Sequence, residues 1–110
     1  MALSTKKCIP CEGKTPPLTE EQIQKYLPEV PGWEVLENQK IRKEFIFKNF
    51  KAALDFTNKV GEIAETEQHH PDIHLVSYKK VIIELWTHAI GGLSENDFII
   101  AAKIENLKKR

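Results

Sequence analysis

The residues best suited to chemistry in this chain are its four histidines, which all lie between positions 69 and 88. Three belong to the segment Gln68-His69-His70-Pro71-Asp72-Ile73-His74, and the fourth is His88. The imidazole side chain has an unperturbed pKa of about 6.5, so it can both accept and donate protons at neutral pH. Histidines that the fold brings together would therefore perform acid/base chemistry or bind a metal ion.

A β-hairpin between the histidine pair and His88 would bring these side chains together. If the turn is centred within Ser77–Lys80, His69 is opposite His88, and directly opposed side chains have Cβ atoms about 4.5–5.5 Å apart. We therefore expect His69, His70 and His88 to surround one site. His74 should lie deeper along the strand, as an ordinary hydrogen-bonded histidine.

A zinc site is the competing interpretation, built from the histidines alone or from Cys8 and Cys11 with two of them. Pro71 prevents His70 and His74 from sharing one helical turn, although on a strand they would share a face. The Cys8-x-x-Cys11 pair has no second pair to complete a zinc ligand set, and no strand or helix flanks it as in a thioredoxin-type motif. The spacing is not diagnostic of a metal site, and we expect no metal.

The composition is that of an ordinary soluble domain, with 41% hydrophobic and 29% charged residues. Sixteen basic and sixteen acidic side chains cancel, so no overall field would attract nucleic acid or a membrane surface. We find no secretory signal and no apolar run near the roughly 20 residues that span a bilayer. Two closely spaced cysteines cannot staple a fold, so a cytoplasmic location is expected.

The elements that position the histidines can be predicted from capping and periodicity. Residues 1–17, rich in proline and without periodicity, predict an irregular arm, and residues 18–110 a single domain. In that domain, Thr19 and Gln22 form a capping box for a helix that Pro28 ends.

The other elements follow from alternating or helical apolar patterns. They are strands over 32–36 and 41–47, a helix that Asn49 caps and that ends before Pro71, strands from Ile73 and over 81–86, and a helix after Ser94. Hairpins between the strands imply an antiparallel sheet. The predicted fold is an α+β two-layer sandwich, a four-stranded antiparallel sheet covered on one face by helices in the order α-β-β-α-β-β-α. Its other face and its edges would remain available for self-association.

A wider pattern surrounds the histidines: Glu65, three residues, His69-His70-Pro71, six residues, Tyr78, nine residues, His88, eight residues and Asp97. It is accompanied by Pro31-Gly32-Trp33 upstream and by Gly91-Gly92-Leu93-Ser94 after Thr87-His88. This pattern resembles the signature of the pterin-4a-carbinolamine dehydratases, and the resemblance extends over about Leu18 to Leu107. It is far more specific than a lone pair of histidines.

The resemblance implies a hydro-lyase of the same α-β-β-α-β-β-α fold. Its substrate would be the small molecule 4a-hydroxytetrahydropterin, which loses water to give quinonoid dihydropterin in tetrahydrobiopterin recycling. The protein would be linked functionally to an aromatic amino-acid hydroxylase and would form a homodimer or homotetramer. No metal and no organic cofactor are implied.

The family's catalytic histidines carry over onto His69, His70 and His88. His69 and His88 would transfer protons, and His70 would mainly hold the pterin. The residues expected to bind substrate are Gln68, His70, Trp86, Thr87 and Ala89, and the supporting residues are Glu65 and Asp97. Three of these residues have a simpler structural explanation: Asp97 could complete a capping box with Ser94, Glu65 could be a solvated helix-end residue, and Trp86 could fill the core.

Two positions depart from many animal members of the family. Gln68 replaces an acid before the histidine pair, and Asn96 replaces an arginine before Asp97. The alternative function is a non-catalytic binding or assembly protein on the same fold, either a coactivator of homeodomain transcription factors or a RuBisCO assembly factor. Retention of all three motif histidines favours the enzyme.

Overall fold

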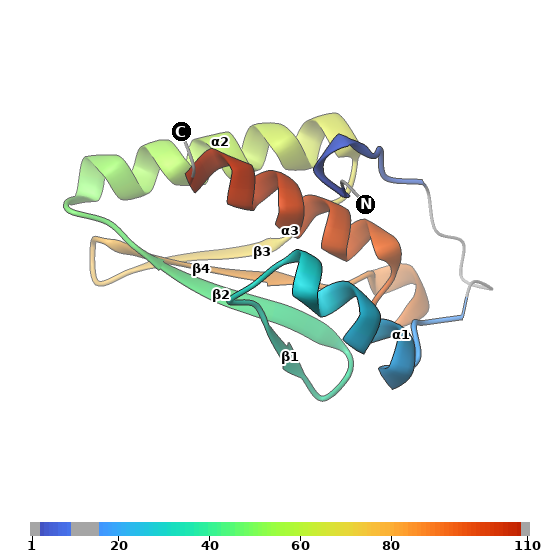
Figure 1. The fold of residues 1–110 in the computed structure, drawn as a ribbon. Helices are drawn as coiled ribbons and strands as arrows, with labels where there is room; N and C mark the ends of the chain where they lie inside the picture. Colours follow the sequence, from blue (N-terminus) through green and yellow to red (C-terminus); the bar gives the residue numbers. More distant parts are fainter. Residues whose placement is uncertain (1–2, 10–15, 109–110) are drawn as a thin grey trace.

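The computed structural model describes residues 3–9 and 16–108. Its helices are α1 (Glu20–Tyr26), α2 (Phe50–Glu67) and α3 (Glu95–Lys108), and short 3₁₀ turns are η1 (Leu3–Thr5), η2 (Leu27–Glu29) and η3 (His88–Ile90). The strands are β1 (Glu34–Leu36), β2 (Lys40–Ile46), β3 (Asp72–Val76) and β4 (Lys80–Leu85). They form an antiparallel sheet in the order β1-β2-β4-β3. Helices cover one face of it (Figure 1), which confirms the predicted α+β two-layer fold.

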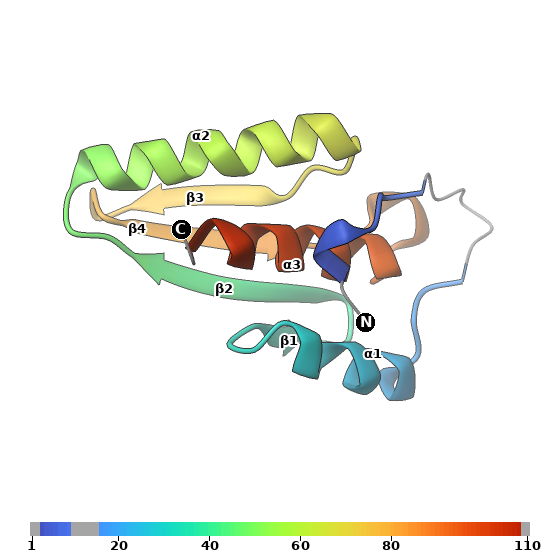
Figure 2. The ribbon, with the colours of Figure 1, turned by 45° about the horizontal axis from the view of Figure 1, so that its top comes forward.

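The helices begin where their capping residues predict. Thr19 and Gln22 make both hydrogen bonds of a capping box at α1, and the Asn49 side chain accepts a hydrogen bond from the backbone N–H of Ala52 at α2. These bonds satisfy N–H groups that the first turn of a helix leaves without partners. In Figure 2, α2 runs over the β3 side of the sheet and α3 crosses nearer its centre.

The core lies between the sheet and the helices. Alternate strand residues point into it, as the period of two predicts; they are Ile41 and Phe45 on β2 and Val81, Ile83 and Leu85 on β4. Helix α3 is buried on more sides than a single apolar stripe requires, because Ile99 and Ala102 are buried beside Ile100 and Ile104. The turn η1 packs on α3 and buries Leu3, so the helix is covered by the sheet and by the start of the chain.

The β3–β4 hairpin differs in register from the prediction. Val76 pairs with Lys80, so the loop is residues 77–79, one residue longer than a tight hairpin. The first two loop residues adopt left-handed φ angles of 50° and 55°, in a segment without the Gly or Asn that would signal them. The extra residue moves the pairing by one position, so the prediction that His69 faces His88 is wrong.

None of the helices among residues 3–9 and 16–108 combines the length and the apolar character of a membrane-spanning segment.

Candidate active site

A cleft of about 810 Å³ opens where the end of α2, the start of β3, the turn η3 and the N-terminal arm meet. The residues that line it are Cys8, Ile9, Thr66, Glu67, Gln68, His69, His70, Pro71, Asp72, Trp86, Thr87, His88, Ala89 and Asn96. The three histidines expected to share a site therefore lie on one cleft. All five residues expected to bind substrate line it as well.

His69 is held by a buried carboxylate from the first turn of α3. Its Nε2 lies 2.6 Å from Oδ1 of Asp97, and the Asp97 side chain is 0% exposed. Because a carboxylate can only accept hydrogen bonds, a neutral His69 carries its ring proton on Nε2 and keeps Nδ1 as an acceptor. Asp97 thereby sets both the orientation and the tautomer of the imidazole.

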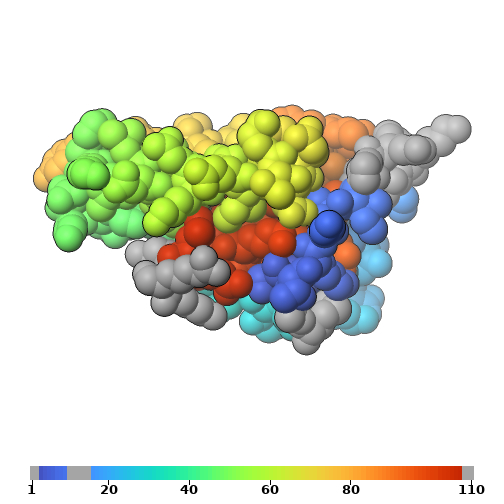
Figure 3. All heavy atoms as spheres, turned by 90° about the horizontal axis from the view of Figure 1, so that it is seen from above, coloured from blue at the N-terminus to red at the C-terminus, as the bar shows by residue number. Residues whose placement is uncertain are grey.

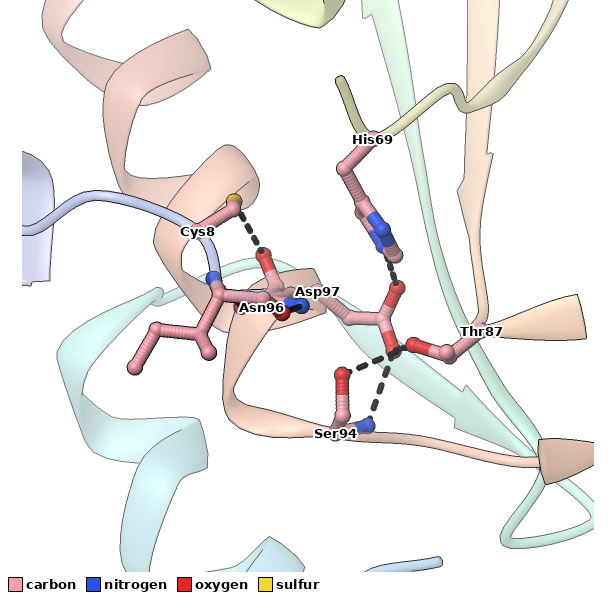
Figure 4. A network of polar contacts seen from close by, with 7 residues as sticks. Cys8, His69, Thr87, Ser94, Asn96 and Asp97 are labelled. Atoms are coloured by element: carbon pink, nitrogen blue, oxygen red, sulfur yellow. Dashed lines mark hydrogen bonds and ion pairs between the residues drawn. The ribbon is translucent and has the colours of Figure 1, made fainter. Parts of the chain in front are cut away.

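The second oxygen of Asp97 is engaged by the loop before α3. Oδ2 accepts hydrogen bonds from the backbone N–H of Ser94 and from the Thr87 hydroxyl, both at 2.9 Å (Figure 4). Because Thr87 donates to Asp97, the Ser94 hydroxyl, 2.7 Å away, must donate to Thr87. Asp97 therefore makes the hydrogen bond with the Ser94 N–H that a capping box requires, as expected. The same carboxylate also orients His69. The Thr87 hydroxyl, expected to bind the pterin ring, is buried with its proton directed at Asp97.

His70 lies on the open side of the cleft, beyond the end of α2. Its Nε2 is 2.9 Å from Oε1 of Glu65, and both side chains are more than half exposed. Gln68 ends the helix in the left-handed conformation, with φ of 54°, and this reversal turns the chain so that consecutive histidines take different partners. A contact between two exposed side chains holds His70 more weakly than the buried Asp97 holds His69.

His88 enters the cleft from the turn η3. Its ring centroid lies 3.9 Å from that of Trp86 at an interplanar angle of 37°. Within the part of the chain that the structure describes, no hydrogen bond to the His88 ring is observed. His88 therefore offers ring nitrogens to the cleft, with Trp86 as its packing partner rather than as a filler of the core.

His74 lies on the uncovered face of the sheet, away from the cleft. Its Nε2 is 3.5 Å from Oε1 of Glu84, which also pairs with Lys40 and Arg42. Among residues 3–9 and 16–108, no three His, Cys, Asp or Glu side chains are placed to hold a metal ion. Cys11, part of the competing zinc interpretation, lies outside the described residues.

Sequence reasoning missed the wall of the cleft that the N-terminal arm supplies. Cys8 and Ile9 line the cleft, and Ile9 pairs with the Asn96 side chain. An arm without periodicity gives no signal of where it docks. The available hint was the position of Asn96, which directly precedes Asp97 and so has to lie near the site.

The sequence profile described as Pterin 4 alpha carbinolamine dehydratase matches residues 16–107. The chain belongs to this family, whose members are named as dehydratases, enzymes of the hydro-lyase class. A relative from Arabidopsis thaliana, named pterin-4-alpha-carbinolamine dehydratase 2, mitochondrial, is 50% identical over 96% of this chain and 59% of its own length. Relatives that share the family name are 53% identical in Nitrosospira multiformis and 46% identical in Rubrobacter xylanophilus, over 91% and 97% of their own lengths and 96% of this chain.

A solved structure from Brucella melitensis supports the same assignment. It is described as a transcriptional coactivator/pterin dehydratase, and it matches with a TM-score of 0.78 and 30% identity. The match covers 83% of this chain and 97% of that one. The present chain therefore shares both the fold and the family of the Brucella protein.

Proposed function

We propose that the protein is a pterin-4a-carbinolamine dehydratase, a hydro-lyase that removes water from 4a-hydroxytetrahydropterin by histidine acid/base catalysis. The observation that carries the proposal is the meeting of His69, His70 and His88 on one cleft, with His69 oriented by the buried Asp97. Membership of the dehydratase family supports the choice of substrate.

The elimination moves two protons and breaks one C–O bond. The proton on N5 passes to a base, the 4a-hydroxyl leaves with a proton from an acid as water, and the electron pair of the N5–H bond forms the C4a=N5 double bond of quinonoid dihydropterin. Positioned groups with a pKa near neutrality contribute about 10²–10⁴-fold to such a step. The substrate is neither oxidised nor reduced, so the step requires only an acid and a base.

His69 and His88 are the groups to which we assign these two transfers. The Asp97 carboxylate holds the His69 proton on Nε2, so Nδ1 can accept a proton, and the resulting imidazolium is stabilised by the same carboxylate. His88 faces the cleft beside Trp86, whose ring offers an apolar face to a flat substrate. The more exposed His70, paired with Glu65, would hold the pterin together with Gln68 and Ala89, which line the same cleft.

The test is the decay of the 4a-carbinolamine absorbance, with the intermediate supplied by a phenylalanine hydroxylase. Parent protein should accelerate the decay, and a His69→Ala/His88→Ala double variant should lose about 10²-fold or more of kcat. His74→Ala is the matched control, because His74 lies on the opposite face of the sheet and should leave the rate unchanged. A double variant as fast as the parent would remove the catalytic assignment.

The physiological setting follows from the proposed reaction. Dehydration would return the pterin of an aromatic amino-acid hydroxylase to tetrahydrobiopterin recycling, in the cytoplasm. We expect a homodimer or homotetramer, since the sheet has an uncovered face and edges. Light scattering of the purified protein measures that oligomeric state.

A second, non-catalytic role is favoured by one observation, the description of the Brucella melitensis protein as a transcriptional coactivator/pterin dehydratase. A coactivator role would not need His69 or His88. The double variant therefore separates the two functions. A growth or expression defect caused by loss of the protein, and repaired by the double variant, would establish the binding role.

A further inference from the structure

Residues 3–9 of the N-terminal arm are docked on the body of the protein. Leu3 is 2% exposed in the core, the Ser4 carbonyl accepts a hydrogen bond of 2.8 Å from Lys103, and Lys6 pairs with Glu95 at 2.9 Å. Figure 3 shows residues 3–9, in blue, against the red helix α3 and beside the yellow end of α2. The arm is thus a docked part of the fold.

Cys8 and Ile9 are clamped by side chains from both helices that border the cleft. Asn96 makes two hydrogen bonds to the backbone of Ile9, accepting from its N–H at 2.9 Å and donating to its carbonyl at 2.6 Å. Glu67, the last residue of α2, accepts the N–H of Cys8 at 2.9 Å. Asn96 is a buried amide, 6% exposed, and this pairing satisfies it with the geometry of a neighbouring strand.

The clamp and the histidine support are built from consecutive residues. Asn96 holds the arm, while Asp97 holds His69 on the other side of the same turn (Figure 4). The backbone groups that carry the clamp are turned toward Asn96 and Glu67. The side chain of Ile9 lines the cleft and is 70% exposed, so it offers the cleft an apolar surface. It lies next to the Cys8 thiol, which also lines the cleft and donates to the Asn96 carbonyl at 3.8 Å.

We propose that Ile9 is a substrate-contacting residue and that Asn96 is a positioning residue that holds it against the bound pterin. This inference rests on the proposed function for the identity of the ligand. An apolar wall that stands beside the ring in the ground state and in the transition state contributes uniform binding, which lowers KM and leaves kcat unchanged.

The test compares the steady-state kinetics of the parent with those of Asn96→Ala and Ile9→Ser. Ile9→Ser keeps the clamp and removes the apolar surface, and its exposed position leaves folding unaffected. Both variants should raise KM by about five- to tenfold, the equivalent of one lost contact, with kcat within about twofold of the parent. Asn106→Ala, on the exposed side of α3, is the matched control and should change neither constant.

Hydrogen exchange provides the readout that separates positioning from folding. In Asn96→Ala the amides of Cys8 and Ile9 should exchange faster, while those of the sheet are unchanged. Unchanged KM in both variants, or a fall in kcat equal to the loss in kcat/KM, would overturn the proposal. If the parent binds 7,8-dihydrobiopterin by calorimetry but does not dehydrate carbinolamine, only the proposed dehydratase function fails. The Kd of each variant for 7,8-dihydrobiopterin then tests the proposed contact between Ile9 and the pterin. If the parent does neither, both fail.

Discussion

The carboxylate of Asp97 and the imidazole of His69 are joined through a 2.6 Å contact between Oδ1 and Nε2, although 28 residues separate them in the chain. The carboxylate comes from the first turn of α3 and the imidazole from the segment just past α2. The relative position of two helices therefore determines how the proposed base is oriented. Asp97 is also the buried centre to which the loop before α3 is tied, through Ser94 and Thr87.

Replacing Asp97 by Asn should impair both the reaction and the stability. An amide has one acceptor oxygen, so either the His69 N–H or the donors Ser94 and Thr87 lose their partner. We expect kcat to fall by about 10²-fold or more and the free energy of unfolding to fall by about 1–3 kcal/mol. Steady-state kinetics and urea unfolding measure the two effects. Asp55→Asn, on the exposed face of α2, is the control, and an unchanged kcat in folded Asp97→Asn would reduce Asp97 to a capping residue.

Truncation of Leu3 to Ala should show that the arm contributes to stability. A buried Leu→Ala change costs about 2–5 kcal/mol, and we expect the lower end, about 2 kcal/mol, because the arm can detach locally. Urea unfolding of the variant measures the cost. Leu54→Ala removes the same atoms from a residue that is 39% exposed and should cost less than about 1 kcal/mol. Equal costs would show that the arm does not stabilise the fold.

Tyr26 should make stability fall at alkaline pH. Burial raises the pKa of its phenol above 10.0, and the hydrogen bond to Glu95 and the charge of that carboxylate raise it further. The neutral phenol is therefore favoured in the folded state, so its contribution is complete below pH 10.0 and is lost as the pH rises through the folded-state pKa.

Tyr26→Phe should remove this dependence. The variant should be less stable than the parent by about 1 kcal/mol at neutral pH, and the two unfolding free energies should converge above pH 10.0. Urea unfolding across this range measures the difference. Tyr78→Phe deletes a phenol from an exposed turn, and a similar convergence there would mean that the effect is not specific to the contact with Glu95.

The left-handed turn between β3 and β4 should accept glycine. Ser77 has φ of 50°, a conformation that costs an L-residue about 1–2 kcal/mol and costs glycine no steric penalty. Glycine also gives the unfolded chain more conformational entropy, which offsets part of the relieved strain. Ser77→Gly should therefore raise the free energy of unfolding by about 0.5–1 kcal/mol. Thermal and urea unfolding test this. The same change at Asp72, in extended β3, should destabilise the protein, and a destabilised Ser77→Gly would show that the serine side chain matters more than the backbone.

Most of the fold could be predicted because its local signals agree with one another. The capping box at Thr19, the cap at Asn49 and the alternation along β2 each specify a structure within a few residues, and each was confirmed. The register of the second hairpin was not predictable in this way, because left-handed residues at Ser77 and Tyr78 follow from the fold rather than from residue type.

The parts of the site that could be predicted are those formed by neighbouring residues or by the family signature. The adjacent His69 and His70 belong to that signature, and they lie just past the end of α2. The partners of Asp97 and the docking of the arm depend on contacts between distant segments, whose energies become apparent only when the helices are packed. The spacing of the histidines does not predict that Asn96 and Ile9 lie beside the cleft.

The docking of the arm on α3 also sets the order in which the protein can be completed during synthesis. Ser4 leaves the ribosome well before Lys103, which donates a hydrogen bond to its carbonyl from 99 positions later in the chain. Until α3 has emerged and packed on the sheet, the arm has no surface to bind and His69 has no carboxylate. A contact between residues so far apart in the sequence carries a larger entropic cost of loop closure than the contacts within a helix or a hairpin. The arm can therefore dock, and the cleft can be completed, only after α3 has packed on the sheet.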